Sequence, residues 1–191
     1  MAAPERIALG GELMLRRWRA ADAEAQALAI AESLEHLRPW LAWATPAGVE
    51  ERRARLARWE EEWDACEDLV YGLFLGQAVV GGCGLHRRIP NGMEIGYWVH
   101  VAHTRRGYAT AAAAALTSVA FTLPGIEAVE IHHDRANVAS AGVPRRLGFR
   151  LVGERPPHGA SAPAESGVFL IWRMTRDHWR PALAPSPSPP L

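Results

Sequence analysis

The sequence predicts an α/β fold, built around a strand–helix–strand unit in the middle of the chain. Residues 93–99 are rich in aromatic and β-branched side chains and follow a Pro-Asn-Gly turn at residues 90–92, which is typical of a strand. A loop around Gly107 leads into a run of alanines that favours a helix, and residues 126–131 have the composition of another strand. Two strands joined through a helix form a right-handed parallel crossover, so we expect a sheet with helices against it.

The rest of the chain adds strands and helices in order. Alternating apolar residues predict strands at residues 13–18, 69–75 and 79–86, the last two joined as a hairpin through Gly76 and Gln77. Helical composition covers residues 20–37 and 48–66, and the charges of the second helix suit a solvated face. A stretch rich in proline and small residues at 156–166 separates the last two strands, where it is interpreted as a lid or as a contact in a homodimer.

Length and charge restrict the organisation and the partners. The chain has 191 residues, and we expect one domain over residues 1–180 and a disordered tail rich in proline and serine over 181–191. The 21 basic residues, all arginine, balance 21 acidic ones, so nothing favours a nucleic acid or an anionic membrane as partner. Two cysteines, the lack of a signal-peptide pattern and the lack of a long apolar run favour the cytoplasm.

The loop from Thr104 to Thr110 is the most informative segment. The first amide groups of a helix have no acceptor within the helix, and the helix dipole adds positive charge there, so a pyrophosphate binds well at such a place. Gly107 lets the backbone approach an anion, and Arg105 and Arg106 offer charged hydrogen bonds to its oxygens. The alternative is an ordinary helix start with two solvated arginines.

Further motifs stand in register with this loop. Glu-Ile-Gly-Tyr-Trp occupies residues 94–98, Arg-Arg-Gly-Tyr-Ala-Thr residues 105–110, Asn-x-x-Ser residues 137–140 and Leu-Gly-Phe residues 147–149, and the segment at 33–41 is followed by Trp43. In this order they resemble the GNAT acetyltransferase superfamily, in particular its Rim-like branch of ribosomal-protein N-terminal acetyltransferases. The resemblance implies a mixed, mostly antiparallel twisted sheet of about seven strands with flanking helices, and a V-shaped split between its two central strands. It also implies transfer of acetyl from acetyl-CoA to a primary amine, with coenzyme A as the product.

The resemblance assigns the cofactor contacts residue by residue. They are backbone groups of Trp98, Val99 and Val101, the loop residues Thr104, Arg105, Arg106, Gly107, Tyr108, Ala109 and Thr110, and the side chains of Asn137 and Ser140. The hydroxyl of Ser140 is then the candidate general acid beside the sulfur. The alternative for Asn137 and Ser140 is helix capping. Gly142 and Pro144 depart from the family pattern and predict that this helix is short, late or kinked.

The resemblance also suggests a base and an acceptor region. Glu94 on the central strand is the first candidate for the catalytic base, with His86 and the run His132-His133-Asp134 as rivals. Strand alternation puts Glu94, Gly96 and Trp98 on one face and Ile95, Tyr97 and Val99 on the other. Tyr97 is interpreted as packing or as a contact of the cofactor arm. Trp40, Trp43 and His86 are the candidates for acceptor binding. No spacing of His and Cys suggests a metal site.

Three functions remain open at this point. The first is acetylation of the N-terminal α-amine of a protein or peptide, and the second is acetylation of a small-molecule amine, antibiotics included. The third is a non-catalytic module that binds acyl-CoA. Because the chain has no acidic surplus, a strongly cationic acceptor has less support.

Overall fold

A computed structural model describes residues 3–65, 67–157 and 160–180, so the tail predicted at 181–191 lies outside the described residues. Its strands form one eight-stranded sheet in the order β1-β2-β3-β4-β5-β6-β8-β7. They are β1 (Arg6–Gly10), β2 (Leu13–Arg17), β3 (Leu69–Leu75), β4 (Ala78–His86), β5 (Gly92–Val99), β6 (Ala128–Asp134), β7 (Arg150–Arg155) and β8 (Phe169–Thr175). The α-helices are α1 (Ala23–Glu32), α2 (Leu34–Leu37), α3 (Val49–Asp64), α4 (Tyr108–Thr122) and α5 (Val138–Arg146). Within the described ranges, no helix combines the length and apolar character needed to cross a membrane.

The predicted mixed, mostly antiparallel sheet with flanking helices is confirmed, with three local differences. Strand β1 was missed, because a five-residue segment that pairs only with β2 carries little pattern of its own. The helix expected at 20–37 is broken into a 3₁₀ turn, α1 and α2, with Ser33 between the last two. The strand expected at 126–131 lies further along, at β6.

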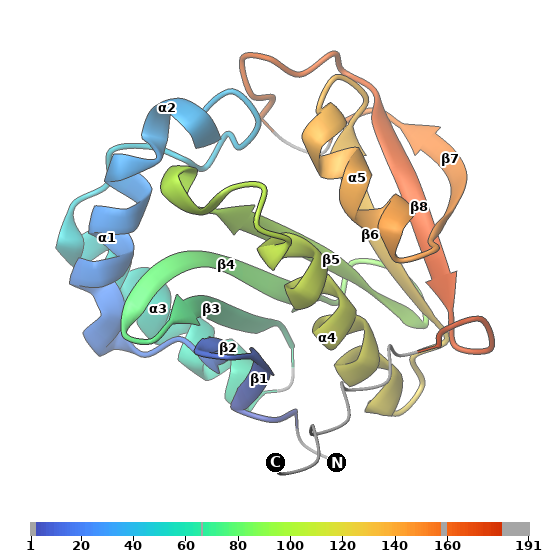
Figure 1. The fold of residues 1–191 in the computed structure, drawn as a ribbon, viewed down its shortest axis with the longest axis horizontal. Helices are drawn as coiled ribbons and strands as arrows, with labels where there is room; N and C mark the ends of the chain where they lie inside the picture. The colour runs from blue at the N-terminus through green and yellow to red at the C-terminus, as the bar shows by residue number, and fades with distance from the viewer. Residues whose placement is uncertain (1–2, 66, 158–159, 181–191) are drawn as a thin grey trace, which may run out of the picture.

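The sheet opens between its two central strands. β5 and β6 pair in parallel from Gly92 opposite Ala128 to Ile95 opposite Ile131, and the pairing stops there. Beyond that point β5 continues to Val99 beside β4, and β6 continues to Asp134 beside β8. Figure 1 shows the two halves of the sheet converging at one end and spreading apart at the other, with α4 crossing in front of the gap. The predicted V-shaped split is therefore confirmed.

Each face of the sheet has its own apolar core. On one face Ile95, Leu116 and Ile131 belong to the larger core, which α4 closes. On the other face Trp18 and Leu56 belong to a second core, which α1 and α3 close and against which Trp98 packs. The alternation predicted for β5 is thus confirmed, and the face that carries Glu94, Gly96 and Trp98 is the one covered by α1 and α3. We call it the α1/α3 face.

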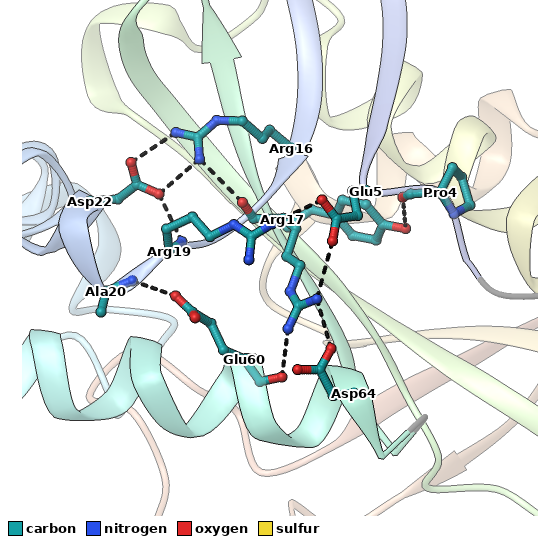
Figure 2. A network of polar contacts seen from close by, with 10 residues as sticks. Pro4, Glu5, Arg16, Arg17, Arg19, Ala20, Asp22, Glu60 and Asp64 are labelled. Carbon is teal, nitrogen blue, oxygen red and sulfur yellow. Dashed lines mark hydrogen bonds and ion pairs between the residues drawn. The ribbon is translucent and has the colours of Figure 1, made fainter.

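A buried arginine ties the N-terminal segment to this layer. Arg17 on β2 is 6% exposed and donates to the carbonyl of Glu60 at 2.7 Å. It also pairs with Asp64 at 2.8 Å and with Glu5 at 3.3 Å, and Figure 2 shows these partners around its guanidinium group. Its guanidinium carbon lies 5.2 Å from the ring centre of Trp63. The planar fork of arginine serves several acceptors at once, which fixes α3 against the edge of the sheet.

Candidate active site

The N-terminus of α4 is built to receive an anion. Gly107 caps this helix in a left-handed conformation with φ +79°, and the first helical hydrogen bond runs from Ala111 N–H to its carbonyl at 2.9 Å. The amide groups of Tyr108, Ala109 and Thr110 are therefore not used by the helix, and they lie at the positive end of its dipole. Arg105, exposed in the same loop, also has positive φ, at 60°. The loop fits a pyrophosphate group, as predicted from the sequence.

The split supplies a second feature. Past Ile95, the backbone groups of β5 that point toward β6 have no partner strand in the described sheet. Unpaired amide and carbonyl groups in such a place require water or a ligand. A chain of amides such as the pantetheine arm of coenzyme A is suited to this edge, because it offers the complementary donors and acceptors.

One cavity of about 1050 Å³ joins the loop, the split and the α1/α3 face. Aromatic side chains dominate its far end, where the rings of Trp43 and Trp98 meet edge to face with centres 6.4 Å apart. Other residues of its wall at this end are Trp18, Gln26, Trp40, Arg52, Arg55, Arg58, Trp59 and Glu62. The cavity therefore runs from the Gly107 loop to an aromatic end, with the split between them.

The structure brings fourteen of the sixteen predicted site residues to this cavity. They are Trp40, Trp43, His86, Glu94, Trp98, Val99, Thr104, Arg105, Gly107, Tyr108, Ala109, Thr110, Asn137 and Ser140. Val101 and Arg106 are the exceptions. The amide of Val101 donates to the hydroxyl of Ser33 at 3.1 Å, and the guanidinium of Arg106 donates to the carbonyl of Ala102 at 3.3 Å. Both groups are engaged by the protein itself, and their assignment as ligand contacts stays a prediction.

Helix α5 places Ser140 beside β5. Asn137 is the N-cap, and its side-chain oxygen accepts from the amide of Ser140 at 3.1 Å, so capping is confirmed and adds to its place in the cavity wall. The helix has nine residues and contains Pro144, so it is short as predicted, but it starts directly at Asn137 and is not late. The hydroxyl oxygens of Tyr97 and Ser140 lie 2.8 Å apart. Burial raises the pKa of Tyr97 to about 12, and the hydrogen bond with Ser140 opposes that change.

Two candidate bases face each other on the α1/α3 face. His86 on β4 lies opposite Glu94 on β5. The carboxylate of Glu94 is 3.4 Å from Arg88 and 3.4 Å from Nδ1 of His132. Nδ1 of His86 is 2.5 Å from Asp68.

Glycines within a strand mark a bulge or the close approach of another group, and β4 contains three of them, Gly81, Gly82 and Gly84. A Cβ atom built on Gly82 would lie 2.7 Å from Nε1 of Trp98, and one built on Gly84 would lie 2.8 Å from Nε2 of His86. The approaching groups at these two positions are therefore rings of the protein itself.

The three residues at the end of β6 that rivalled Glu94 have separate roles. His132 bonds Glu130 at 2.6 Å on the α1/α3 face, whereas His133 accepts from the indole of Trp172 at 2.9 Å. Asp134 accepts from Ala136, Ser166 and Gly167. Among the residues that the structure describes, no three His, Cys, Asp or Glu side chains are arranged to hold a metal ion.

Sequence reasoning missed Asp68 and treated Tyr97 as packing or as a contact of the cofactor arm. Asp68 precedes β3 and shows no local motif, and only the register of the β3–β4 hairpin could have placed it beside His86. Tyr97 was assigned to the correct face, but its polar partner is 43 residues away, on α5. Both signals are long-range contacts, which a single sequence does not display.

Comparisons with known proteins agree with this geometry. A family model described as "Acetyltransferase (GNAT) domain" matches residues 12–150. A putative ribosomal N-acetyltransferase, YdaF of Bacillus subtilis strain 168, is 29% identical over 132 residues, which cover 67% of this chain and 72% of that protein.

Solved structures share the fold. RimL, a ribosomal-protein α-N-acetyltransferase in complex with coenzyme A, has a TM-score of 0.82 at 20% identity, covering 91% of this chain and 99% of its own. MccE, a microcin self-immunity acetyltransferase in complex with acetyl-CoA and AMP, has a TM-score of 0.81 at 18% identity, covering 90% and 97%. The predicted resemblance to the Rim-like branch is confirmed. With most of its length matched by the family model, the chain belongs to the GNAT acetyltransferase family and is an acetyl-CoA-dependent N-acetyltransferase.

Proposed function

We propose that the acceptor is the N-terminal α-amine of a protein or peptide. The observation that carries this proposal is the pairing of the cavity's acidic side chains. Glu62, Asp68, Glu94 and Asp134 line the cavity, and each has a partner within the protein. Glu62 pairs with Arg58, Asp68 with His86, and Glu94 with Arg88 and His132, while Asp134 accepts from three neighbouring groups.

This arrangement disfavours polyamines and aminoglycosides. An acceptor with several ammonium groups needs carboxylates that are ready to receive them, because a charge removed from water must be compensated. Here the acidic groups are already compensated, and the wall also contains the buried guanidinium group of Arg52. The tryptophans at the aromatic end suit the apolar side chains and planar amides of a short peptide.

The α-amine also suits the chemistry. An α-amino group has a pKa of about 8, whereas a lysine side chain has one of about 10.4, so a far larger fraction of α-amine is neutral near pH 7. Only the neutral amine attacks a carbonyl carbon. An N-terminal amine therefore requires less help from a base than an alkylamine does.

The donor end of the cavity fits acetyl-CoA, which supplies the acetyl group as a thioester. In the proposal, the amides of Tyr108, Ala109 and Thr110 together with Arg105 hold the pyrophosphate, and the open edge of β5 at Trp98 and Val99 binds the pantetheine amides. Ser140, fixed by Tyr97, gives a proton to the departing sulfur. Holding both substrates at reacting distance supplies most of the remaining acceleration.

The relatives support the same acceptor class. YdaF and RimL carry names that refer to ribosomal proteins, which present N-termini, and a reaction on such proteins would take place in the cytoplasm. The name of MccE refers to microcin self-immunity, and its structure contains AMP. A planar small molecule could also stack on the tryptophans, so a small-molecule amine is the second candidate.

The experiment is a panel of acceptors assayed by release of free thiol from acetyl-CoA. One peptide has a free N-terminus and no lysine, and its matched control has the same sequence with a blocked N-terminus and one added lysine. Spermine, an aminoglycoside and an aminoacyl nucleotide complete the panel. We expect turnover only with the free N-terminus. The mass spectrum should show an increase of ~42 Da at its α-amine, the mass change when an acetyl group replaces one hydrogen. Turnover with only the nucleotide or only spermine would show that the acceptor belongs to that class instead. If none of the acceptors caused release of thiol, the result would favour the non-catalytic binding module.

A further inference from the structure

We propose that His86 is the catalytic base of this enzyme and that Asp68 is its positioning residue. His86 takes the proton from the acceptor ammonium through Nε2, while Asp68 holds the ring from the other side. The inference rests on the N-acetyltransferase activity and deepens the proposed function, but it does not depend on which amine is the natural acceptor.

The first step concerns the tautomer of His86. Its Nδ1 is 2.5 Å from Oδ2 of Asp68, and the other carboxylate oxygen accepts from the backbone amide of Arg87 at 3.1 Å. A carboxylate with both oxygens fixed in this way accepts the Nδ1 proton and leaves the lone pair on Nε2. Burial acts to raise the pKa of Asp68, but the hydrogen bond and charge of His86 outweigh it, and the pKa of Asp68 lies below its ordinary value.

The second step concerns the direction of Nε2. This atom lies over β4 and β5, 2.8 Å from the position of a Cβ on Gly84 and 3.7 Å from that of a Cβ on Gly96. Gly96 is the first residue of β5 beyond the pairing with β6, so the ring lies where the sheet opens. Among the described residues, no group hydrogen-bonds Nε2, and the side chain is 16% exposed in the cavity wall. The lone pair is thus available to a ligand at the split.

The third step compares His86 with Glu94, which lies opposite on β5. The carboxylate of Glu94 is between Arg88 and His132, and its side chain is 12% exposed. Glu94 therefore already has a partner in Arg88, which competes with an acceptor amine for its carboxylate. His86 has a carboxylate behind its ring and no partner in front, which is the arrangement of a base that accepts and then releases a proton.

Other charged groups share this environment and must be counted in any pH dependence. Those that face the same part of the cavity are Arg55, Arg58 and Glu62 on α3, Arg88 after β4, Glu94 on β5 and His132 on β6. Asp68 contacts the ring of His86 directly. Removal of Asp68 should therefore affect the tautomer of His86 more than removal of any of these other groups.

The proton balance is simple. The acceptor enters as an ammonium ion and gives one proton to Nε2 of His86. Its lone pair forms the new bond to the carbonyl carbon, the carbon–sulfur bond breaks, and the electron pair of that bond stays on sulfur. The second proton of the amine leaves nitrogen and one proton reaches sulfur to give the thiol. The proton held by His86 passes to water, so one proton is released in each turnover.

The test compares the pH dependence of kcat/KM in four single variants with that of the wild type, using the acceptor found in the panel. For His86→Gln we expect a loss of about 100-fold and no acidic limb, with acetyl-CoA binding kept within about twofold. For Asp68→Asn we expect a loss of about tenfold in kcat/KM, because the ring of His86 is no longer held with its proton on Nδ1. Asp68→Glu should restore part of the activity. His178→Gln removes an exposed histidine that bonds Thr175 outside the cavity and should leave the profile unchanged.

A second measurement does not depend on turnover. Long-range ¹H–¹⁵N correlation spectra report the tautomer of each histidine ring, and we expect His86 to carry its proton on Nδ1 in the wild type and to lose that preference in Asp68→Asn. A wild-type proton on Nε2 would overturn the dyad even if no acceptor were known. An unchanged acidic limb in His86→Gln would show that another group is the base. In that case Glu94→Gln, measured as a fifth variant, would show by loss of the limb that the base is Glu94. Lack of turnover in the wild type would instead count against the acetyltransferase assignment.

Discussion

The hydroxyl of Tyr97 on β5 lies 2.8 Å from Oγ of Ser140 on α5 and donates to the carbonyl of the same serine at 3.2 Å. That carbonyl would accept from the amide of residue 144 in a regular helix, but residue 144 is proline and has no N–H group. Tyr97 thus takes the place of the missing donor. Because Pro144 leaves this carbonyl without a helical donor, Tyr97 can bond it across the split. This contact holds Ser140 in the wall of the cavity.

Replacing Tyr97 by Phe should lower kcat about tenfold, because a lost hydrogen bond of about 1.4 kcal/mol leaves Ser140 free to rotate. The dissociation constant of acetyl-CoA should change less than twofold, since the ring itself remains. Steady-state kinetics and calorimetry measure the two quantities. Tyr71→Phe is the matched control, because its hydroxyl donates at 2.9 Å to the carbonyl of Pro4, which is not part of the cavity wall. An equal loss of kcat in both variants would show that the Tyr97 contact is merely structural.

Replacing Pro144 by Ala should raise the free energy of unfolding by about 1 kcal/mol, because α5 regains a hydrogen bond to the Ser140 carbonyl and loses a poor helix former. Urea denaturation measures this change. Pro124→Ala, in the turn after α4, is the control and should be neutral or destabilising, because it only adds freedom to the unfolded chain. A less stable Pro144→Ala protein would mean that α5 depends on the proline.

Gly107→Ala and Gly125→Ala form a matched pair. Both glycines have positive φ, +79° and +72°, and at neither does an added Cβ meet another atom within 4 Å. Each change should therefore cost about 1 kcal/mol of stability through backbone strain. Only Gly107→Ala should also weaken acetyl-CoA binding, by about tenfold or more, because its methyl group faces the phosphate site; calorimetry measures it. If the two variants bound acetyl-CoA with equal affinity, the pyrophosphate would not bind at the Gly107 loop.

Asp134 should make stability depend on pH. Burial acts to raise its pKa, but hydrogen bonds from Ser166, Ala136 and Gly167 outweigh it, so the pKa in the folded protein lies below the ordinary value. A lowered pKa stabilises the fold above the unfolded value of about 3.9 and loses that contribution as the pH falls through the folded value. Asp134→Asn should be less stable than wild type at pH ~7, and urea denaturation should show the difference shrinking at pH ~3. A difference that is constant over this range would contradict the assignment.

Arg17 and Arg19 test the N-terminal network of Figure 2. Arg17 is buried and holds Glu60, Asp64 and Glu5, whereas Arg19 is largely exposed and pairs with Glu5 at 2.9 Å. Arg17→Met should lower the free energy of unfolding by about 3 kcal/mol, and Arg19→Met by less than about 1 kcal/mol. Chemical denaturation distinguishes them, and similar losses would mean that burial of Arg17 adds nothing. Acetyl-CoA affinity should be unchanged in both.

Much of the donor site could be predicted from the sequence, because it is local. The turn before β5, the left-handed Gly107 and the alanines of α4 act over a few residues, and each has a conformational preference that is visible in the chain. The order of the motifs then identified the family. The contacts of Val101 with Ser33 and of Arg106 with Ala102 could not be predicted, because they depend on how the segments fold back.

The acceptor side was decided by the tertiary structure. In the β3–β4 hairpin the register shifts by one residue between Leu73 and Phe74. Continued by one residue, the shifted ladder puts Asp68 opposite His86, whereas the register set at the turn would put it opposite Leu85, on the other face. The contacts of Ser140 with Tyr97 likewise join segments far apart in the chain. The sequence by itself determined the fold class, the phosphate loop and the family, because short-range preferences encode them. The tertiary structure alone decided which side chains meet across the split, because packing of distant strands and helices sets their register and direction.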